Sequence, residues 1–310
     1  MGKLAIVFSG QGAQYPGMGK SLYENFDSAK KLYDFAENFR NGTKEQSFNG
    51  TKEELCLTKN TQPCLYLVDL CAALALSEYG IVPDAVAGFS LGEIAALAYA
   101  GAYSYEKGFE IVCSRALFMD KAANENKTCM AAVLKLDSKT VEDICAKIRN
   151  GGEKIYPVNY NSPVQTVVAG SQSAVALFKE EAKPLPARVI DLAVSAAFHS
   201  PYMDNAADDF CKYLEKTEFD KLKMPVYANY TAKAYGENIF DTLKKQMNNP
   251  VRWCDTIKNM IDDGYTDFIE AGAGKTLCGL IGKISSEVRT YSAEDFESVK
   301  KTVEAVRANA

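Results

Sequence analysis

A short motif places Ser90 between two glycines, Gly88 and Gly92. The apolar run before Gly88 predicts the end of a buried strand, and residues 91–100 predict a helix. Ser90 is therefore expected at a sharp strand-to-helix turn of the nucleophile-elbow type, where side chains at the glycine positions would collide. A serine held in this way can attack an acyl group.

The same residues allow a plainer interpretation, because Ser90 and Glu93 also have the spacing of a helix capping box. A helix cap does not require glycine at positions 88 and 92, whereas a tight turn requires both Gly88 and Gly92. The glycines favour the nucleophile, and the cap remains the alternative at this point.

A serine nucleophile needs a general base, and His199 is the single histidine of the chain. Pro201 disfavours a helix at Ser200, which predicts that His199 lies on a loop before the helix expected at residues 203–216. A lone histidine usually has no catalytic role, so the case for His199 depends on the case for Ser90.

Arg115 falls on the apolar side of the helix expected at residues 105–121, within a stripe made by Ile111, Val112, Ala116 and Met119. A guanidinium that faces the core is costly unless it meets an anion, because it does not deprotonate. The partner is either a structural Asp or Glu, which position alone favours, or the carboxylate of a bound ligand.

The composition describes a globular protein of 310 residues with 47% hydrophobic residues and a net charge of −5. This charge argues against broad nucleic-acid binding, and no apolar run is long enough to cross a membrane. No signal peptide is evident, and the nine cysteines contain no Cys-x-x-Cys pair, so free thiols in the cytoplasm are expected. With one histidine and no paired cysteines, no zinc site is predicted.

Two glycine-containing loops follow predicted strands without completing a nucleotide motif. The strand expected at residues 3–9 leads into Gly10-Gln11-Gly12, but Tyr15 stands where a dinucleotide motif needs glycine. The strand at 267–270 leads into a Gly-Lys-Thr sequence that lacks the first glycine of a phosphate loop. The first loop is expected at the carboxyl edge of a sheet, where α/β proteins place their sites, and a simple turn remains the alternative.

The middle of the chain predicts a separate unit of strands and helices. We expect, in order, strand 129–135, helix 138–149, strand 155–161, strand 165–170, helix 172–182 and strand 187–193. This βαββαβ order is that of a ferredoxin-like unit, and a unit inserted in a larger α/β domain can form one wall of a cleft.

Taken together, these segments resemble the malonyl-CoA:acyl carrier protein transacylases, a bacterial acyltransferase family. The resemblance extends over nearly the whole chain and is carried by Phe8 to Gly12, Thr61-Gln62-Pro63, Gly88 to Glu93, Arg115, Asn159 to Pro163, Phe198-His199-Ser200, Gln246 to Trp253 and Glu270 to Lys275. It implies an α/β-hydrolase-like catalytic domain formed by residues 1–127 and 195–310. Residues 128–194 would be the inserted ferredoxin-like subdomain.

The resemblance also assigns roles to the residues that match the family's motifs. Ser90 would be the nucleophile and His199 its base, with a backbone carbonyl near Gln246 fixing the imidazole tautomer. The amides of Gln11 and Leu91 would form the oxyanion hole.

Three further positions match the motifs that lie near the family's site. Arg115 would bind the malonyl carboxylate, and Gln62 and Asn161 would lie close to the substrate. The family usually has histidine where this chain has Phe89, a change that we expect to leave the chemistry intact. Phe198 resembles the pattern of malonyl-using rather than methylmalonyl-using enzymes.

The reaction implied by the resemblance is the transfer of a malonyl group from malonyl-CoA to the phosphopantetheine thiol of acyl carrier protein. It would proceed by ping-pong exchange through a malonyl-serine and supply fatty-acid synthesis. No cofactor is expected beyond the coenzyme A thioester substrate, and the partner would be acyl carrier protein. A cytoplasmic monomer that binds neither nucleic acid nor membrane is expected.

Two other functions fit parts of the sequence. A serine hydrolase or thioesterase could use the same elbow, but it would have no use for Arg115. A non-catalytic module that docks carrier protein is hinted at by Phe89 alone.

Overall fold

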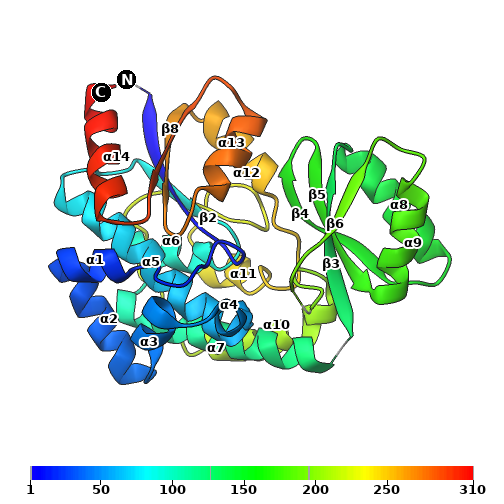
Figure 1. Ribbon diagram of the computed structural model, residues 1–310, viewed down its shortest axis with the longest axis horizontal. Helices are drawn as coiled ribbons and strands as arrows, with labels where there is room; N and C mark the ends of the chain where they lie inside the picture. The colour runs from blue at the N-terminus through cyan, green and yellow to red at the C-terminus, as the bar shows by residue number, and fades with distance from the viewer. Residues whose placement is uncertain (1, 126, 195, 310) are drawn as a thin grey trace.

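The computed structural model describes residues 2–125, 127–194 and 196–309, which form an α/β fold with two sheets (Figure 1). The larger sheet is parallel, in the strand order β7-β2-β1-β8-β9. These strands are Val226–Tyr227, Ala85–Gly88, Lys3–Phe8, Tyr265–Ala271 and Arg289–Ala293.

Helices cover both faces of the parallel sheet because both faces of its central strands are apolar. Along β1, Ile6 and Phe8 face one core cluster while Ala5 and Val7 face the other. The larger cluster joins α1 (Lys20–Asn25), α2 (Asp27–Phe39), α5 (Thr58–Glu78), α6 (Gly92–Tyr99), α7 (Tyr105–Glu125), α10 (Asp204–Leu214) and α14 (Phe296–Ala308). The smaller cluster joins α12 (Trp253–Asp262) and α13 (Thr276–Ile284). Shorter helices are α3 (Thr43–Asn49), α4 (Lys52–Cys56), α11 (Ile239–Leu243) and the 3₁₀ turn η1 (Pro201–Met203).

The helix predicted from Thr61 begins three residues earlier, so α5 contains Pro63 in its interior. Thr61 is not the cap; its hydroxyl donates to the carbonyl of Leu57 at 3.1 Å. Proline has no N–H for the carbonyl of Lys59, four residues back. That carbonyl instead accepts from the guanidinium of Arg40 at 3.5 Å.

The second sheet is antiparallel, in the strand order β4-β5-β3-β6. Its strands are β3 (Thr128–Leu134), β4 (Ile155–Ser162), β5 (Gln165–Ser171) and β6 (Arg188–Asp191). The helices α8 (Ser138–Asn150) and α9 (Gln172–Ala182) pack on the face turned away from the rest of the molecule (Figure 1). The predicted βαββαβ order is therefore confirmed in chain order, with a last strand shorter than expected.

This smaller unit, which we call the β3–β6 unit, packs against the rest of the molecule, and its residues Met130, Val158 and Val167 belong to the larger core cluster. It follows α7 and precedes η1 in the chain, and the boundary predicted at residue 195 lies outside the described residues. A backbone bridge also joins β4 to the segment before α12. The Tyr160 N–H donates to the Val251 carbonyl, and the Val251 N–H donates to the Val158 carbonyl, both at 2.9 Å.

The turn after β2 confirms the steric prediction made from its glycines. A Cβ on Gly88 would lie 2.0 Å from the carbonyl carbon and oxygen of Gly92, and a Cβ on Gly92 would lie 2.5 Å from the carbonyl oxygens of Phe8 and Ser9. Neither backbone can move aside without breaking the sheet. Ser90, between the two glycines, has a left-handed φ of 54°.

We expect Gly88→Ala to lower the free energy of unfolding by about 3 kcal/mol or more, because its methyl group would overlap the Gly92 backbone. Gly279→Ala is the matched control. Gly279 is helical, and a Cβ there meets nothing within 4 Å. Alanine at this position should therefore raise the free energy of unfolding by about 0.5–1 kcal/mol. Urea unfolding of both variants measures the two changes, and equal effects would contradict the steric role of Gly88.

Candidate active site

Ser90 and His199 are in direct contact although 109 positions separate them in the sequence. Ser90 lies between the end of β2 and the start of α6, and its Oγ is 2.7 Å from Nε2 of His199. The capping interpretation is wrong, since the N-cap position of α6 is Leu91 and no side-chain hydrogen bond caps this helix.

The contacts of His199 determine which ring nitrogen carries the proton. Its Nδ1 lies 3.0 Å from the backbone carbonyl of Gln246, which can only accept, so Nδ1 carries the hydrogen and Nε2 is free to accept from Ser90. Burial, followed by the charge of Arg115, lowers the pKa of His199 to about 4. The imidazole is therefore neutral near pH 7, the form that a general base requires.

Arg115 is a fully buried residue of α7, with 0% of its surface exposed. Its Nη1 donates to the side-chain oxygen of Gln62 at 2.6 Å, and its Nη2 donates to Oγ of Ser90 at 3.1 Å. Burial lowers the pKa of Arg115 to about 10, which still leaves the guanidinium charged at neutral pH. Among the ion pairs of the described residues, none includes Arg115. Arg115 therefore does not form, within the described residues, the structural ion pair that its position in the sequence favoured.

The side chain of Gln246 connects these residues, a role that its position in the sequence did not reveal. Its Oε1 accepts from Arg115 Nη2 at 2.8 Å and from Arg115 Nε at 3.3 Å. Its Nε2 donates to the carbonyl of Ser90 at 2.6 Å and to Glu93 Oε2 at 3.0 Å. Because its own backbone carbonyl accepts from His199, Gln246 bonds to Arg115, Ser90, His199 and Glu93.

Asn229 was not predicted from the sequence at all. Its side-chain oxygen accepts from the Ser90 N–H at 2.7 Å, and its side-chain nitrogen donates to the Gly88 carbonyl at 2.6 Å. These bonds hold the backbone on both sides of the left-handed residue. The signal in the sequence was a polar residue at the carboxyl end of a strand, just after β7.

Gln11 and Leu91 were expected to offer backbone amides to an oxyanion. Leu91 directly follows Ser90, and Gln11 lies in the loop after β1 and lines a cavity with Ser90 and His199. Within residues 2–125, 127–194 and 196–309, neither amide N–H makes a hydrogen bond.

The cavity at Ser90 has a volume of about 70 Å³, and Phe89, Met119, Met130 and Phe198 contribute apolar walls. A second cavity of about 210 Å³ shares Gln11, Phe89, Asn159 and Leu192 with it. Asn161 lines only this second cavity, so it lies beside the site and not against Ser90. Phe89 borders both cavities, and its ring packs against Trp253 with 5.6 Å between centroids.

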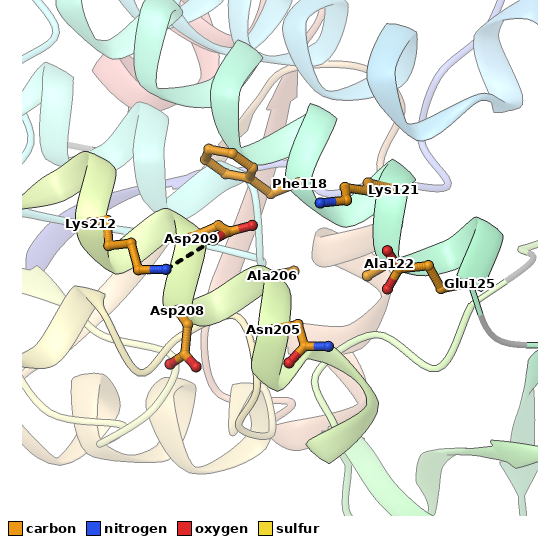
Figure 2. Close-up of a pocket in the computed structure, with 9 residues that line it drawn as sticks. All are labelled: Phe118, Lys121, Ala122, Glu125, Asn205, Ala206, Asp208, Asp209 and Lys212. Atoms are coloured by element: carbon orange, nitrogen blue, oxygen red, sulfur yellow. Dashed lines mark hydrogen bonds and ion pairs between the residues drawn. The ribbon is translucent and has the colours of Figure 1, made fainter.

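Another pocket, between α7 and α10, has no part in this site (Figure 2). It has a volume of about 270 Å³, and its charged side chains have both signs: Lys121, Lys212, Glu125, Asp208 and Asp209. Figure 2 shows the Nζ of Lys212 directed at Asp209, with which it forms an ion pair of 3.3 Å. It shares no residue with the Ser90 cavity.

Searches of the described ranges gave two negative findings. No cluster of three His, Cys, Asp or Glu side chains with the arrangement of a metal site was found there. No helix of the described chain has the length and hydropathy to cross a bilayer.

Comparison with known proteins identifies relatives along nearly the whole chain. The acyl transferase domain family matches residues 5–296. The malonyl CoA-acyl carrier protein transacylase of Bacillus subtilis (strain 168) is 36% identical over an alignment of 311 positions, which covers 99% of this chain and 98% of that protein.

Solved structures give the same result. The crystal structure of malonyl CoA-acyl carrier protein transacylase from Clostridium perfringens has a TM-score of 0.95 and 35% identity, covering 99% of this chain and 98% of the other. A type II PKS acyl-carrier protein in complex with its malonyl-transacylase includes a chain with a TM-score of 0.93 and 31% identity, covering 98% of this chain and 99% of that one. With its Ser90–His199 pair and this similarity over its full length, the chain belongs to the malonyl CoA-acyl carrier protein transacylase family, within the acyl transferase domain proteins.

Proposed function

We propose that this protein transfers the malonyl group of malonyl-CoA to the phosphopantetheine thiol of acyl carrier protein, through a malonyl ester on Ser90. The observation that carries the proposal is the convergence on one hydroxyl. Ser90 Oγ lies 2.7 Å from His199 Nε2 and 3.1 Å from Arg115 Nη2. A nucleophile, its base and a carboxylate-binding cation are thus within one small site. The names of the relatives support the choice of acyl group and acceptor.

In the first half-reaction, His199 Nε2 takes the proton of Ser90 as Oγ attacks the thioester carbonyl. The bond from the acyl carbon to sulfur then breaks, and the coenzyme A sulfur leaves with the proton that His199 held. The amides of Gln11 and Leu91 would stabilise the negative oxygen of the intermediate, since both are free to donate. In the second half-reaction the thiol of the carrier protein attacks the malonyl ester by the same steps in reverse.

Arg115 would select the malonyl group by pairing with its carboxylate. The guanidinium already donates to Gln62, Gln246 and Ser90, so its plane is fixed before substrate arrives. A malonyl carboxylate would take over N–H groups that now bond to these neutral partners, and a cation already held in one plane loses little side-chain entropy on pairing. An acetyl group would leave the same cation unpaired.

The finer description of the fold and partners belongs to this proposal. Residues 1–127 and 195–310 would form an α/β-hydrolase-like catalytic domain, and residues 128–194 a ferredoxin-like subdomain. The parallel sheet and the βαββαβ order support this description. We further propose a cytoplasmic monomer that needs no cofactor and works in fatty-acid synthesis with acyl carrier protein.

Isotopically labelled malonyl-CoA should leave its label on Ser90 when no carrier protein is present. Ser90→Ala should take up no label and should lose malonyl transfer by about a thousandfold or more, because the acyl-enzyme cannot form. Ser77→Ala, a helical serine outside the cavity, should label like the wild type. Peptide mapping after acid quench locates the label. Steady release of free malonate without carrier protein would instead indicate a thioesterase.

Arg115→Ala should lower kcat/KM for malonyl transfer by about a thousandfold or more, with a change of at most about tenfold for acetyl transfer. The reason is that only the malonyl group offers a carboxylate to the buried cation. Arg40→Ala removes a partly buried arginine that bonds to Gln46 and Asn60, outside the Ser90 cavity. It should leave the malonyl-to-acetyl ratio unchanged. Equal losses for both donors in Arg115→Ala would reject the carboxylate-binding role.

The rate of acyl-enzyme formation at saturating malonyl-CoA should be nearly constant from pH 8 to 5. It should fall only as the pH drops towards 4, because His199 is active while neutral and its pKa is lowered to about 4. Arg115→Gln removes a positive neighbour and should move this fall to higher pH. Rapid-quench measurement gives both profiles. A fall centred near 6.5 in the wild type, the ordinary value for histidine, would contradict the buried environment.

A further inference from the structure

Glu93 is a fully buried carboxyl group behind Ser90, for which the proposed reaction has no use so far. It belongs to the first turn of α6 and has 0% of its surface exposed. Its Oε2 accepts from Gln246 Nε2 at 3.0 Å and from the Asn229 N–H at 3.3 Å. Its Oε1 accepts from the hydroxyl of Tyr235. A buried carboxyl with donors on both oxygens is held in one orientation.

Glu93 and Arg115 influence each other electrostatically without touching. Each favours the charged form of the other, yet no ion pair joins them among the described residues. The amide of Gln246 lies between them, accepting from Arg115 Nη2 at 2.8 Å and donating to Glu93 Oε2 at 3.0 Å. The two charges are therefore separated by one amide group.

The separation matters because a direct pair would occupy the guanidinium. A carboxylate bonded to Arg115 would compete with any carboxylate that a substrate brings, whereas an arginine with no negative charge nearby would be costly to bury. A carboxylate one amide away partly compensates the charge without itself bonding to the guanidinium. It also opposes the binding of a second carboxylate by simple repulsion.

We propose that Glu93 is a positioning residue that acts through Gln246 as the remote counter-ion of Arg115, and so sets how tightly the site holds the malonyl carboxylate. This inference rests on the proposed function. It adds that the affinity of the Arg115 site depends on a group that never contacts the substrate.

The inference predicts a dependence on pH, with a definite sign. The titratable groups around Glu93 are Tyr235, Tyr103 and Arg115, none of which changes charge between pH 5.5 and 8.5. Burial raises the pKa of Glu93 to about 7. As the pH falls through 7, Glu93 gains a proton and loses its charge. The positive charge of Arg115 is then less compensated. The malonyl carboxylate, which stays ionised over this pH range, should therefore bind more tightly.

The experiment measures binding without turnover, in the Ser90→Ala background. Affinities for malonyl-CoA and acetyl-CoA are determined by calorimetry from pH 5.5 to 8.5, and their ratio removes effects on the shared coenzyme A moiety. The ratio should rise about five- to tenfold as the pH falls through 7. In the double variant Ser90→Ala/Glu93→Gln, the affinity ratio should be high at every pH tested. Glutamine keeps the size and an acceptor oxygen, so the hydrogen bond from Gln246 can persist.

A second variant keeps the test usable if Glu93→Gln fails to fold. Tyr235→Phe removes a hydrogen-bond donor that lowers the pKa of Glu93. In the Ser90→Ala background, the rise in the ratio of malonyl-CoA to acetyl-CoA affinity should therefore occur at higher pH. Asp267→Asn, which breaks the ion pair with Arg289 far from the site, is the control for stability alone and should leave the profile unchanged.

The outcomes separate the two proposals. If Ser90→Ala prefers malonyl-CoA but Glu93→Gln and Tyr235→Phe leave both the preference and its pH dependence unchanged, the role of Glu93 is overturned. If Ser90→Ala shows no preference for malonyl-CoA at any pH, the proposed function itself fails.

Discussion

The arrangement of the site depends on one electrostatic constraint, a fully buried guanidinium that no carboxylate touches directly. An arginine without water or a direct ion pair must find polar neighbours for its N–H groups. Here Gln62 and Gln246 supply side-chain oxygens, and Ser90 supplies its hydroxyl. Gln246 can serve Arg115 only because its nitrogen has acceptors of its own, in Glu93 and the Ser90 carbonyl. The positions of these polar residues follow from the need to keep one buried cation charged and hydrogen-bonded.

Backbone conformation is the second constraint, and it affects the two residues in direct contact. Ser90 and His199 both have left-handed φ values, 54° and 58°. This conformation is unfavourable for residues other than glycine and persists only where the surroundings enforce it. For Ser90 the surroundings are Asn229 and the close approach of Gly88 to Gly92. The strands β1 and β2 lie in the middle of the sheet with core on both faces, which gives this turn a rigid support.

Much of this organisation could be predicted from the sequence, and the remainder has identifiable physical reasons. The elbow is a local feature, so its glycines revealed it directly. From the residues alone, without the family resemblance, His199 could be inferred only because the chain has no other histidine. The roles of Glu93, Asn229 and the Gln246 side chain depend on contacts between residues more than 130 positions apart. No periodicity in a single segment reports such contacts, and Glu93 looked like a helix-capping residue.

The lengths of some helices and strands also could not be predicted from the sequence pattern. The apolar stretch at 224–230 predicts a strand of seven residues, but β7 pairs over only Val226–Tyr227. After it the chain folds back, with the Ala228 N–H donating to the Lys233 carbonyl at 2.9 Å. This turn is what brings Asn229 against the elbow, so the shortened strand and the support of Ser90 have a common cause.

The bonds between β4 and Val251 have a mechanical consequence. A lobe joined only by linkers can swing open and shut, but here the paired backbone bonds at Val251 and the buried packing of Met130 and Val158 would have to break before the unit could rotate. The walls that β3 and β4 contribute to the two cavities beside Ser90 are therefore fixed in the native fold and do not open as a lid would.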